Sequence, residues 1–300
     1  MELRGKTVFA TGANGFVGTH VAERLVKEGL RVRALVRSPE AAAELQRRGV
    51  EAVLGELTDK DALPAAARGA DLVVHCAATG AHDLEEARRV NVEATATLAE
   101  AALAEGCERF VHISTVGVYP LREREGVLDE DSPMVTGGDA YSVTKAEGEQ
   151  VVSAAAARGL RAVILRPAVI LGVHPSSFWG TVFPKQIAAG QFVHVDEGRT
   201  RLGYLHISTL VEAVVRALQT DDERVIGQVF NIVDGHATWE SYTRHFRKSP
   251  LPSVSSDRVP GFFSFRGSYA TEKAERLLGL APRDVFEASL EEIVRALPQA

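Results

Sequence analysis

Short apolar runs rich in β-branched residues alternate with longer helical patterns along the first two thirds of the chain. The apolar runs predict strands at 6–11, 31–37, 52–54, 71–76, 110–114 and 162–165. The intervening segments predict helices at 15–28, 39–48, 59–68, 83–105 and 139–157. Continuously apolar strands joined by helices are typical of a parallel sheet that is covered on both faces. We therefore expect an α/β fold with a doubly wound parallel sheet, whose ligands bind beyond the carboxyl ends of the strands.

The pattern becomes less regular after Pro167, where Gly, Pro, Ser and aromatic residues are frequent. Regular elements predicted in this part are a helix near 208–219, a strand at 229–233 and helices at 271–279 and 286–296. We predict a core over 1–170, to which 204–235 return, and a smaller C-terminal lobe over most of 171–300 that binds substrate.

The composition of the 300 residues is that of an ordinary globular protein, with 45% hydrophobic residues and a net charge of −6. No block of Lys and Arg is present, which argues against a nucleic-acid partner. No apolar stretch approaches the roughly 18 residues that would span a membrane. The histidines lack the spacing of zinc ligands, so no metal is expected. The first residues show no signal peptide, and Cys76 and Cys107 suit buried thiols, which indicates a cytoplasmic protein.

Three glycines follow the first predicted strand at intervals of three residues, and a predicted helix begins among them. Gly12 permits a tight turn, Gly15 lets the backbone approach a pyrophosphate, and Gly18 lets the helix pack closely on the sheet. The helix N-terminus offers N–H groups and partial positive charge to the anion. A plain turn between strand and helix is the alternative. In this context we predict the dinucleotide-binding turn of a Rossmann fold, made by Gly12, Asn14, Gly15, Phe16, Val17 and Gly18.

The end of the second predicted strand indicates which dinucleotide would bind. NAD-binding proteins usually carry an acidic residue there, which accepts a hydrogen bond from the 2′-hydroxyl of the ribose. The strand at 31–37 has no acid and ends at Arg37, whose guanidinium suits a 2′-phosphate. Arg37 would also fit a solvated strand end without any role. We expect NADP(H) as the cofactor rather than NAD(H).

Tyr141 and Lys145 lie four residues apart in the predicted helix at 139–157 and so share one of its faces. A free tyrosine, with a pKa near about 10, is a poor acid–base group at neutral pH. We expect the adjacent ammonium to lower the pKa of the phenol by stabilising the phenolate. Tyr141 would then exchange a proton with a substrate oxygen while hydride moves to or from a nicotinamide. Taken alone, this spacing is more typical of a surface pair, and it is the glycine turn together with Ser114 and Thr115 at a strand end that favours the acid–base role.

Several ordered motifs resemble those of the extended short-chain dehydrogenase/reductase family, which contains sugar-nucleotide epimerases, 3β-hydroxysteroid dehydrogenases and dihydroflavonol-type reductases. The segments that carry the resemblance are 11–18, 55–57, 75–78, 91–95, 113–119, 141–145, 165–168, 204–209 and 230–232. The resemblance implies an NAD(P)-dependent enzyme. Extended members often dimerise through two helices, here 83–105 and 139–157, so a homodimer is expected by analogy.

The resemblance also implies roles for individual residues. Thr115 would hydrogen-bond the substrate oxygen, Tyr141 would carry the proton, and Lys145 would also hold the nicotinamide ribose. Glu56 would lie beside the adenine, with Leu57 packed on it.

Further cofactor contacts are implied for residues at the ends of later strands. These residues are Cys76, Ala77, Ala78, Ser114, Pro167, Ala168 and Val169. Asn91 would tie the cofactor side of the site to a neighbouring helix, and a purely structural role for it is the alternative.

Several positions depart from the pattern of sugar-nucleotide members. Val169 stands where they carry Asn, Leu171 where they carry Tyr, and Thr209 where they carry a later Asp. A nucleotide sugar needs polar partners, because unmatched buried polar groups are costly. If the aromatic residues of the variable segments line one cavity, the substrate is a small apolar carbonyl compound or alcohol; otherwise they are core. These aromatic residues are Tyr119, Phe178, Trp179, Phe183, Phe262, Phe263 and Phe265.

Three functions are compatible with these features. The first is an NADP(H)-dependent oxidoreductase acting on a small, apolar, non-sugar substrate. The second is a sugar-nucleotide epimerase or dehydratase with tightly held NAD. The third is a non-catalytic dinucleotide sensor that regulates a protein partner, although sensors of this kind tend to lose the Tyr141–Lys145 pair that this chain keeps.

Overall fold

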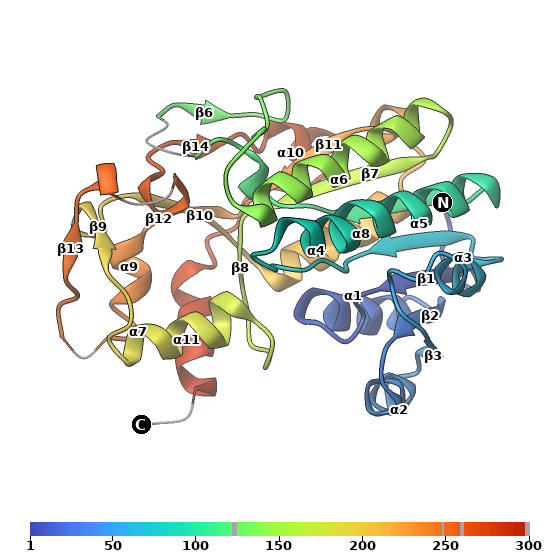
Figure 1. Cartoon of the computed structure of the whole chain (residues 1–300), viewed down its shortest axis with the longest axis horizontal. Coiled ribbons are helices and arrows are strands. Elements are labelled where there is room, and N and C mark those ends of the chain that lie inside the picture. The colour runs from blue at the N-terminus through green and yellow to red at the C-terminus, as the bar shows by residue number, and fades with distance from the viewer. Residues whose placement is uncertain (122–124, 248, 259–260, 298–300) are drawn as a thin grey trace. The chain divides into compact units, whose positions relative to one another are not determined.

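The structure, a computed structural model, describes residues 1–121, 125–247, 249–258 and 261–297 (Figure 1). Its main sheet has seven strands in the order β11-β7-β5-β4-β1-β2-β3. The strands are β1 (Thr7–Thr11), β2 (Arg31–Val36), β3 (Glu51–Leu54), β4 (Leu72–His75), β5 (Arg109–Ile113), β7 (Ala162–Pro167) and β11 (Val229–Ile232). The pairings from β7 through to β3 are parallel. The strand order runs outward in both directions from β1 and β4, which confirms the doubly wound sheet.

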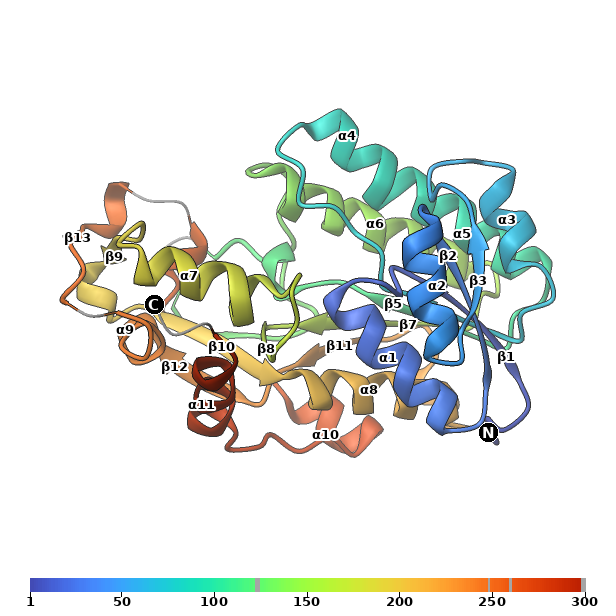
Figure 2. The ribbon, with the colours of Figure 1, turned by 90° about the horizontal axis from the view of Figure 1, so that it is seen from below.

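Helices cover both faces of this sheet (Figure 2). They are α1 (Phe16–Lys27), α2 (Pro39–Arg47), α3 (Ala62–Ala67), α4 (Leu84–Arg88), α5 (Ala94–Ala104), α6 (Ala140–Ala157) and α8 (Ile207–Gln219). On the face under α5 and α6, Phe9, Val73 and Phe110 stand in register across β1, β4 and β5. They pack with Leu98 of α5 and Val152 of α6. The apolar residues predicted to make strands therefore form the buried layer.

The row of side chains on this face becomes polar toward the carboxyl ends of the strands. Two residues beyond Phe9 and Val73 on β1 and β4 come Thr11 and His75, and His112 follows Phe110 on β5 in the same way. Since side chains on a strand alternate between faces, all three lie on the face that α5 and α6 cover. All three are buried.

The predicted helix at 83–105 is interrupted. Between α4 and α5 lies a π-helical segment, η1 (Arg89–Glu93), which contains the buried Asn91. The predicted helix at 59–68 is also shorter than expected, because Asp59 accepts hydrogen bonds from the N–H groups of Asp61 and Ala62, each at 2.9 Å, and α3 begins only at Ala62. Hydrophobic periodicity does not distinguish a π segment from a regular helix.

The chain divides into two compact units. The first comprises 1–118, 135–166 and 211–230, and the second comprises 119–134, 167–210 and 231–300. Compared with the predicted division, residues 119–134 are grouped with the second unit, and the returning segment is shorter. The assignment of the second unit to substrate binding stays a prediction.

The second unit contains a three-stranded sheet, β12-β10-β8, and an aromatic core. Its strands are β6 (Val127–Leu128), β8 (Val169–Leu171), β9 (His194–Val195), β10 (Arg201–His206), β12 (Gly235–Thr238), β13 (Ser253–Val254) and β14 (Ser268–Tyr269). Its helices are α7 (Phe183–Ala188), α9 (Trp239–Thr243), α10 (Glu272–Leu278) and α11 (Phe286–Ala296). Among the described residues, no helix is both long and apolar enough to cross a membrane.

Candidate active site

Three parallel strands bring most of the predicted site residues to one edge of the sheet. Because β1, β4 and β5 end in register, the segments that follow them, 12–18, 76–78 and 114–115, are neighbours. All of these segments belong to the first unit, as do Tyr141 and Lys145.

The glycine turn after β1 depends on the absence of side chains. Gly12 has a φ of +69°, and a Cβ atom there would lie 2.8 Å from the backbone nitrogen of Ala77. A Cβ atom on Gly18 would lie 2.1 Å from the carbonyl oxygen of Gly12. Gly15 closes the turn by donating its N–H to the same carbonyl oxygen at 3.0 Å. The roles predicted for Gly12 and Gly18, a tight turn and close helix packing, agree with this geometry.

The N-terminus of α1 fits an external anion. Its N-cap residue, Gly15, offers no capping side chain, and no acidic residue lies in the first turn. The positive end of the helix dipole is therefore not compensated by the side chains of this turn. Asn14 is exposed beside it, while Phe16 and Val17 are partly buried. Helix N-termini of this kind bind phosphate groups.

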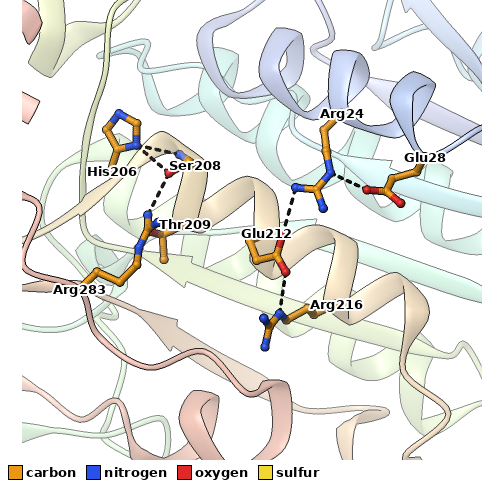
Figure 3. Close-up of polar contacts among 8 residues, drawn as sticks. All are labelled: Arg24, Glu28, His206, Ser208, Thr209, Glu212, Arg216 and Arg283. Atoms are coloured by element: carbon orange, nitrogen blue, oxygen red, sulfur yellow. Dashed lines mark hydrogen bonds and ion pairs between the residues drawn. The ribbon is translucent and has the colours of Figure 1, made fainter.

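Ion pairs fix the other end of α1 (Figure 3). Arg24 donates to Glu28 at 2.6 Å and to Glu212 at 3.1 Å, and Arg216 donates to Glu212 at 2.8 Å. Glu212 and Arg216 come from the part of α8 that belongs to the first unit. Each pair is partly exposed and contributes little to stability. Together they hold α1 against α8.

Arg37 lies exposed directly after β2. It makes no hydrogen bond or ion pair with any described residue, whereas Arg33 on the same strand is paired with Glu51. Ser38 accepts a hydrogen bond from the N–H of Ala41 at 3.2 Å and so caps α2. The guanidinium of Arg37 is therefore available to a ligand.

Glu56 and Leu57, predicted to lie beside the adenine, follow β3. Glu56 is exposed, and Leu57 is partly buried against the core under α5 and α6. Their contact with a cofactor stays a prediction.

Tyr141 and Thr115 form the acid–base part of the candidate site. Tyr141 lies in the first turn of α6, which Asp139 caps by accepting the N–H of Ser142 at 2.9 Å. Burial raises the pKa of the Tyr141 phenol, and a hydrogen bond with the Thr115 hydroxyl acts in the opposite direction. The Thr115 hydroxyl also accepts the N–H of Gly117 at 3.0 Å. Thr115 can therefore donate to a phenolate while its own position is held by the backbone.

Lys145 is buried one turn further along α6, with only 2% of its surface exposed. Its Nζ donates to the carbonyl oxygen of Ile113 at 2.7 Å and lies 3.5 Å from Nε2 of His112. Burial lowers the pKa of Lys145 to about 8, although the carboxylate of Glu149 raises it. Lys145 therefore remains largely an ammonium ion at neutral pH.

One electrostatic expectation for this pair is wrong. The sequence predicted that Lys145 lowers the pKa of Tyr141, whereas burial raises the pKa of the phenol. The physical reason is that burial removes the water that would stabilise a charged phenolate. The ammonium of Lys145 has its two acceptors on β5 and makes no hydrogen bond with the phenol. A neutral phenol at neutral pH is suited to donating a proton.

Asn91 is a structural clamp in this structure. Its Oδ1 accepts the N–H of Thr79 at 2.9 Å, and its Nδ2 donates to the carbonyl oxygen of Thr79 at 3.0 Å and to the hydroxyl of Thr144 at 2.9 Å. Gly148 allows α6 to approach, because a Cβ there would lie 2.6 Å from the carbonyl oxygen of Asn91. Asn91 thus ties the loop after β4 to α6, which agrees with a structural role, and its role toward a cofactor stays a prediction.

The remaining residues after β4 and β5 are placed near the turn. Cys76 and Ala77 are partly buried, Ala78 is exposed, and burial raises the pKa of the Cys76 thiol to about 12, which keeps it protonated. Ser114 is buried, and its hydroxyl has no hydrogen-bond partner among the described residues. An unpaired hydroxyl at this edge is consistent with contact to a ligand.

The buried His75, for which the sequence predicts no role, links these segments. The N–H of Ala77 donates to the Thr11 hydroxyl at 3.2 Å, and this hydroxyl lies 2.6 Å from Nδ1 of His75. Nε2 of His75 lies 2.8 Å from the hydroxyl of Thr95, which donates to the carbonyl oxygen of Asn91. The Thr95 hydroxyl uses its single proton for the carbonyl of Asn91, so it can only accept from Nε2 of His75. His75 therefore carries its proton on Nε2, and its Nδ1 accepts from the Thr11 hydroxyl. His75 therefore ties the turn after β4 to η1.

Three predicted cofactor contacts lie in the second unit. Pro167, Ala168 and Val169 are all buried there, and their contact with a carboxamide stays a prediction.

Thr209 stands where sugar-nucleotide members carry Asp, and the carboxylate of Asp234, also in the second unit, lies beside it. Asp234 accepts the N–H of His206 at 2.9 Å and the hydroxyl of Thr209 at 2.7 Å. Arg283 donates to Thr209 and to Ser208 (Figure 3). Asp234 lies in the sequence after β11, so spacing around Thr209 could not reveal it.

Five of the seven aromatic residues predicted to line a cavity belong to one cluster. Trp179, Phe183, Phe262 and Phe263 pack around Trp239, and Phe178 packs on Trp179 and Phe183. Tyr119 and Phe265 lie apart from this cluster and stack on Tyr269. Tyr119, Phe183 and Phe265 are fully buried, so for these three the core interpretation holds. Phe178 is 46% exposed, which leaves part of the cluster accessible.

Comparison with known proteins identifies the family. Residues 8–233 match the model of the NAD dependent epimerase/dehydratase family. The chain belongs to this family. It is an NAD(P)-dependent enzyme of the extended short-chain dehydrogenase/reductase type, as the motifs predicted.

Relatives within the family act on different substrates. The chain is 34% identical to a 4-hydroxy-2-methyl-3-oxo-4-farnesyl-3,4-dihydroquinoline-1-oxide ketoreductase of Stigmatella aurantiaca, over 76% of this chain and 68% of the relative. It is 31% identical to sterol demethylase protein B of Methylococcus capsulatus, over 77% and 71% of the two chains. The solved structure of MoeE5 in complex with UDP-glucose and NAD matches with a TM-score of 0.80 at 25% identity, over 96% of this chain and 97% of MoeE5.

No metal site accompanies these features in the described part of the chain. No three His, Cys, Asp or Glu side chains there are grouped so that they could hold a metal ion.

Proposed function

We propose that this family member is an NADP(H)-dependent oxidoreductase that reduces a carbonyl group, or oxidises the corresponding alcohol, on a small apolar substrate. One observation carries the proposal. The Thr115 hydroxyl is close enough to the Tyr141 phenol to oppose the rise of its pKa, and Tyr141 lies one helical turn from a buried ammonium, while Thr115 follows β5 at the sheet edge where the glycine turn lies.

The protonation states of these groups support the reducing direction. Burial keeps the Tyr141 phenol neutral, so it can donate its proton to an oxygen that gains negative charge. The Thr115 hydroxyl would hydrogen-bond the same oxygen and then stabilise the phenolate that remains. The nicotinamide, when bound, supplies or accepts the hydride. Lys145 would hold the ribose of the nicotinamide.

The choice of NADP(H) rests on Arg37. An exposed guanidinium that no described side chain uses, directly after β2, suits a 2′-phosphate. The adjacent α1 N-terminus suits the pyrophosphate.

The apolar substrate class rests on the second unit and on the relatives. Val169 and Leu171 are buried apolar residues at positions where sugar-nucleotide enzymes carry polar side chains. Phe178, which packs on Trp179 and Phe183 of the aromatic cluster, is 46% exposed. The ketoreductase relative is named for a substrate with a farnesyl chain.

The proposal is tested by incubating the purified chain with NADPH and a panel of apolar ketones, aldehydes and quinones, and following loss of NADPH. We expect turnover of at least one panel compound, with NADH a poorer donor. Absence of turnover with the whole panel, together with conversion of a UDP-sugar, would refute it.

A sugar-nucleotide epimerase is the second candidate. The family model and the likeness to MoeE5 with UDP-glucose and NAD support it. Such an enzyme returns the hydride to its substrate, so it holds NAD through the whole cycle. Release of stoichiometric NAD on denaturing the purified protein would favour this candidate over the first.

A further inference from the structure

The ammonium of Lys145 has two acceptors in the first unit, and both come from β5. The carbonyl oxygen of Ile113 accepts at 2.7 Å, and Nε2 of His112 lies at 3.5 Å. An ammonium ion has three N–H donors, so two acceptors on one side determine the direction of the third. Lys145 makes no other hydrogen bond among the described residues.

His112 can act only as an acceptor toward Lys145. It is completely buried, and its Nδ1 has no hydrogen-bond partner in the described part of the chain. Burial and the neighbouring ammonium keep the pKa of His112 well below its ordinary value, so the ring is neutral. A neutral imidazole that accepts at Nε2 carries its proton on Nδ1. That proton is buried without a partner, a cost that calls for a functional reason.

The neighbouring imidazole cannot take this role. His75 stands opposite His112 in register, with the two ring centroids 5.3 Å apart. Both of its nitrogens are already used by Thr11 and Thr95. Of the two histidines, His112 alone presents a lone pair to the ammonium.

We propose that His112 is a positioning residue for Lys145: its Nε2 and the carbonyl of Ile113 together hold the ammonium so that one N–H remains directed to the bound cofactor and substrate. The ammonium role itself rests on the proposed function. The contact that holds it rests on the geometry of the chain alone.

Other titratable groups also lie near Lys145, and a test must separate the effect of His112 from theirs. On its own helix, Glu149 raises the pKa of Lys145, and Tyr141 lies four residues before it. From β4 and the residue after it, His75 and Cys76 approach the ammonium. A variant of His112 must leave these groups in place.

The test is a pH titration of the cofactor-free chain carrying lysine labelled with ¹³C at Cε, followed by NMR, with the Lys145 signal assigned through its loss in Lys145→Arg. In His112→Phe the ring remains but the acceptor is lost, so the pKa of Lys145 should move below about 8. In His112→Gln the amide oxygen can accept, and the pKa should return toward that of the unchanged chain. His112→Met repeats the loss of the acceptor without a ring, in case phenylalanine does not fit.

Val111→Ala is the matched control, because Val111 is a buried residue of the same strand whose side chain points to the other face. It should lower the melting temperature without moving the Lys145 titration. An unchanged titration in His112→Phe, an equal shift in Val111→Ala, or a failure of His112→Gln to restore the pKa would each overturn the proposal.

Activity gives a second readout. If the carbonyl reductase activity is found, His112→Phe should lower kcat/KM about five- to tenfold at neutral pH and move the alkaline limb of its pH profile downward, with His112→Gln closer to the unchanged enzyme. The NMR titration needs no activity, so a failed proposal on function leaves this inference testable.

Discussion

Glu149 and Arg166 form a buried, two-pronged ion pair between α6 and β7. Nη2 of Arg166 donates to the carboxylate at 2.6 Å and Nε donates at 2.9 Å, and both side chains are at most 3% exposed. The same carboxylate raises the pKa of Lys145. The pair therefore links the helix that carries the candidate catalytic residues to the sheet, and it also supports the charge of the ammonium.

Removing one partner of this pair should be strongly destabilising. Glu149→Leu leaves a buried guanidinium without its carboxylate, and we expect a loss of about 3–5 kcal/mol in the free energy of unfolding, measured by urea denaturation. The double variant Glu149→Leu, Arg166→Met should recover much of this loss, because no buried charge is left. Purely additive losses in the double variant would contradict this account of the pair.

Burial of His75 should make the free energy of unfolding depend on pH in the acidic range. Burial, with a smaller effect of the Lys145 charge, lowers the pKa of His75 to about 3. Below the ordinary histidine pKa, near about 6.5, the unfolded chain takes up a proton that the folded chain refuses. Stability is therefore lost as the pH falls from about 6.5 toward the folded-state value, by about 1.4 kcal/mol per pH unit for this one group.

The measurement is urea denaturation at several pH values between about 4 and 6. In His75→Gln this part of the pH dependence should disappear. The exposed His82, changed to Gln, is the control and should leave the slope unchanged. Equal slopes in His75→Gln and the unchanged chain would show that His75 does not stay neutral on folding.

Much of the first unit was predictable from local signals. Apolar runs identified β1, β4 and β5, and the glycine spacing identified the turn after β1, because each feature depends on residues close together in the sequence. The π segment at Asn91 was missed, since its hydrophobic pattern is that of a helix. His75 was noted as part of the segment 75–78 that carries the family resemblance and His112 as part of a predicted strand, but neither was given a role. Their roles depend on strand register, which brings positions 37 residues apart in the chain together.

The direction of the Tyr141 pKa was missed for a different reason. The spacing to Lys145 was correct, but it does not reveal that the ammonium finds its acceptors on β5. Nor does it reveal how strongly the phenol is desolvated. The pKa values of the site depend on burial and on partners far away in the sequence, and the spacing of Tyr141 and Lys145 predicts neither.

The glycine turn should not tolerate a methyl group at Gly18. Gly18→Ala places Cβ against the carbonyl oxygen of Gly12, and the backbone must shift. We expect the Kd for NADPH, measured by fluorescence titration, to rise more than about tenfold, and the melting temperature to fall. Gly80→Ala is the control, because nothing lies within 4 Å of a Cβ there. Wild-type affinity in Gly18→Ala would argue against dinucleotide binding at this turn.

Arg37 should distinguish NADPH from NADH. Arg37→Ala should raise the Kd for NADPH about 10- to 100-fold and leave the Kd for NADH nearly unchanged, because only NADPH carries the 2′-phosphate. Arg47→Ala removes an equal charge from the exposed end of α2 and should affect both little. Equal losses for both dinucleotides in Arg37→Ala would reject the 2′-phosphate role.

Proton donation by the phenol of Tyr141 is the central claim, and Tyr141→Phe removes only its hydroxyl. Tyr119→Phe is the control, because it removes the hydroxyl of a buried tyrosine that bonds to Asn231. The decisive measurement compares kcat for NADPH-dependent reduction of an accepted carbonyl compound, and Kd for NADPH, in both variants. The account predicts that Tyr141→Phe loses at least about a hundredfold in kcat with Kd within about twofold, while Tyr119→Phe keeps its activity. Carbonyl reduction at an undiminished rate in Tyr141→Phe would contradict it.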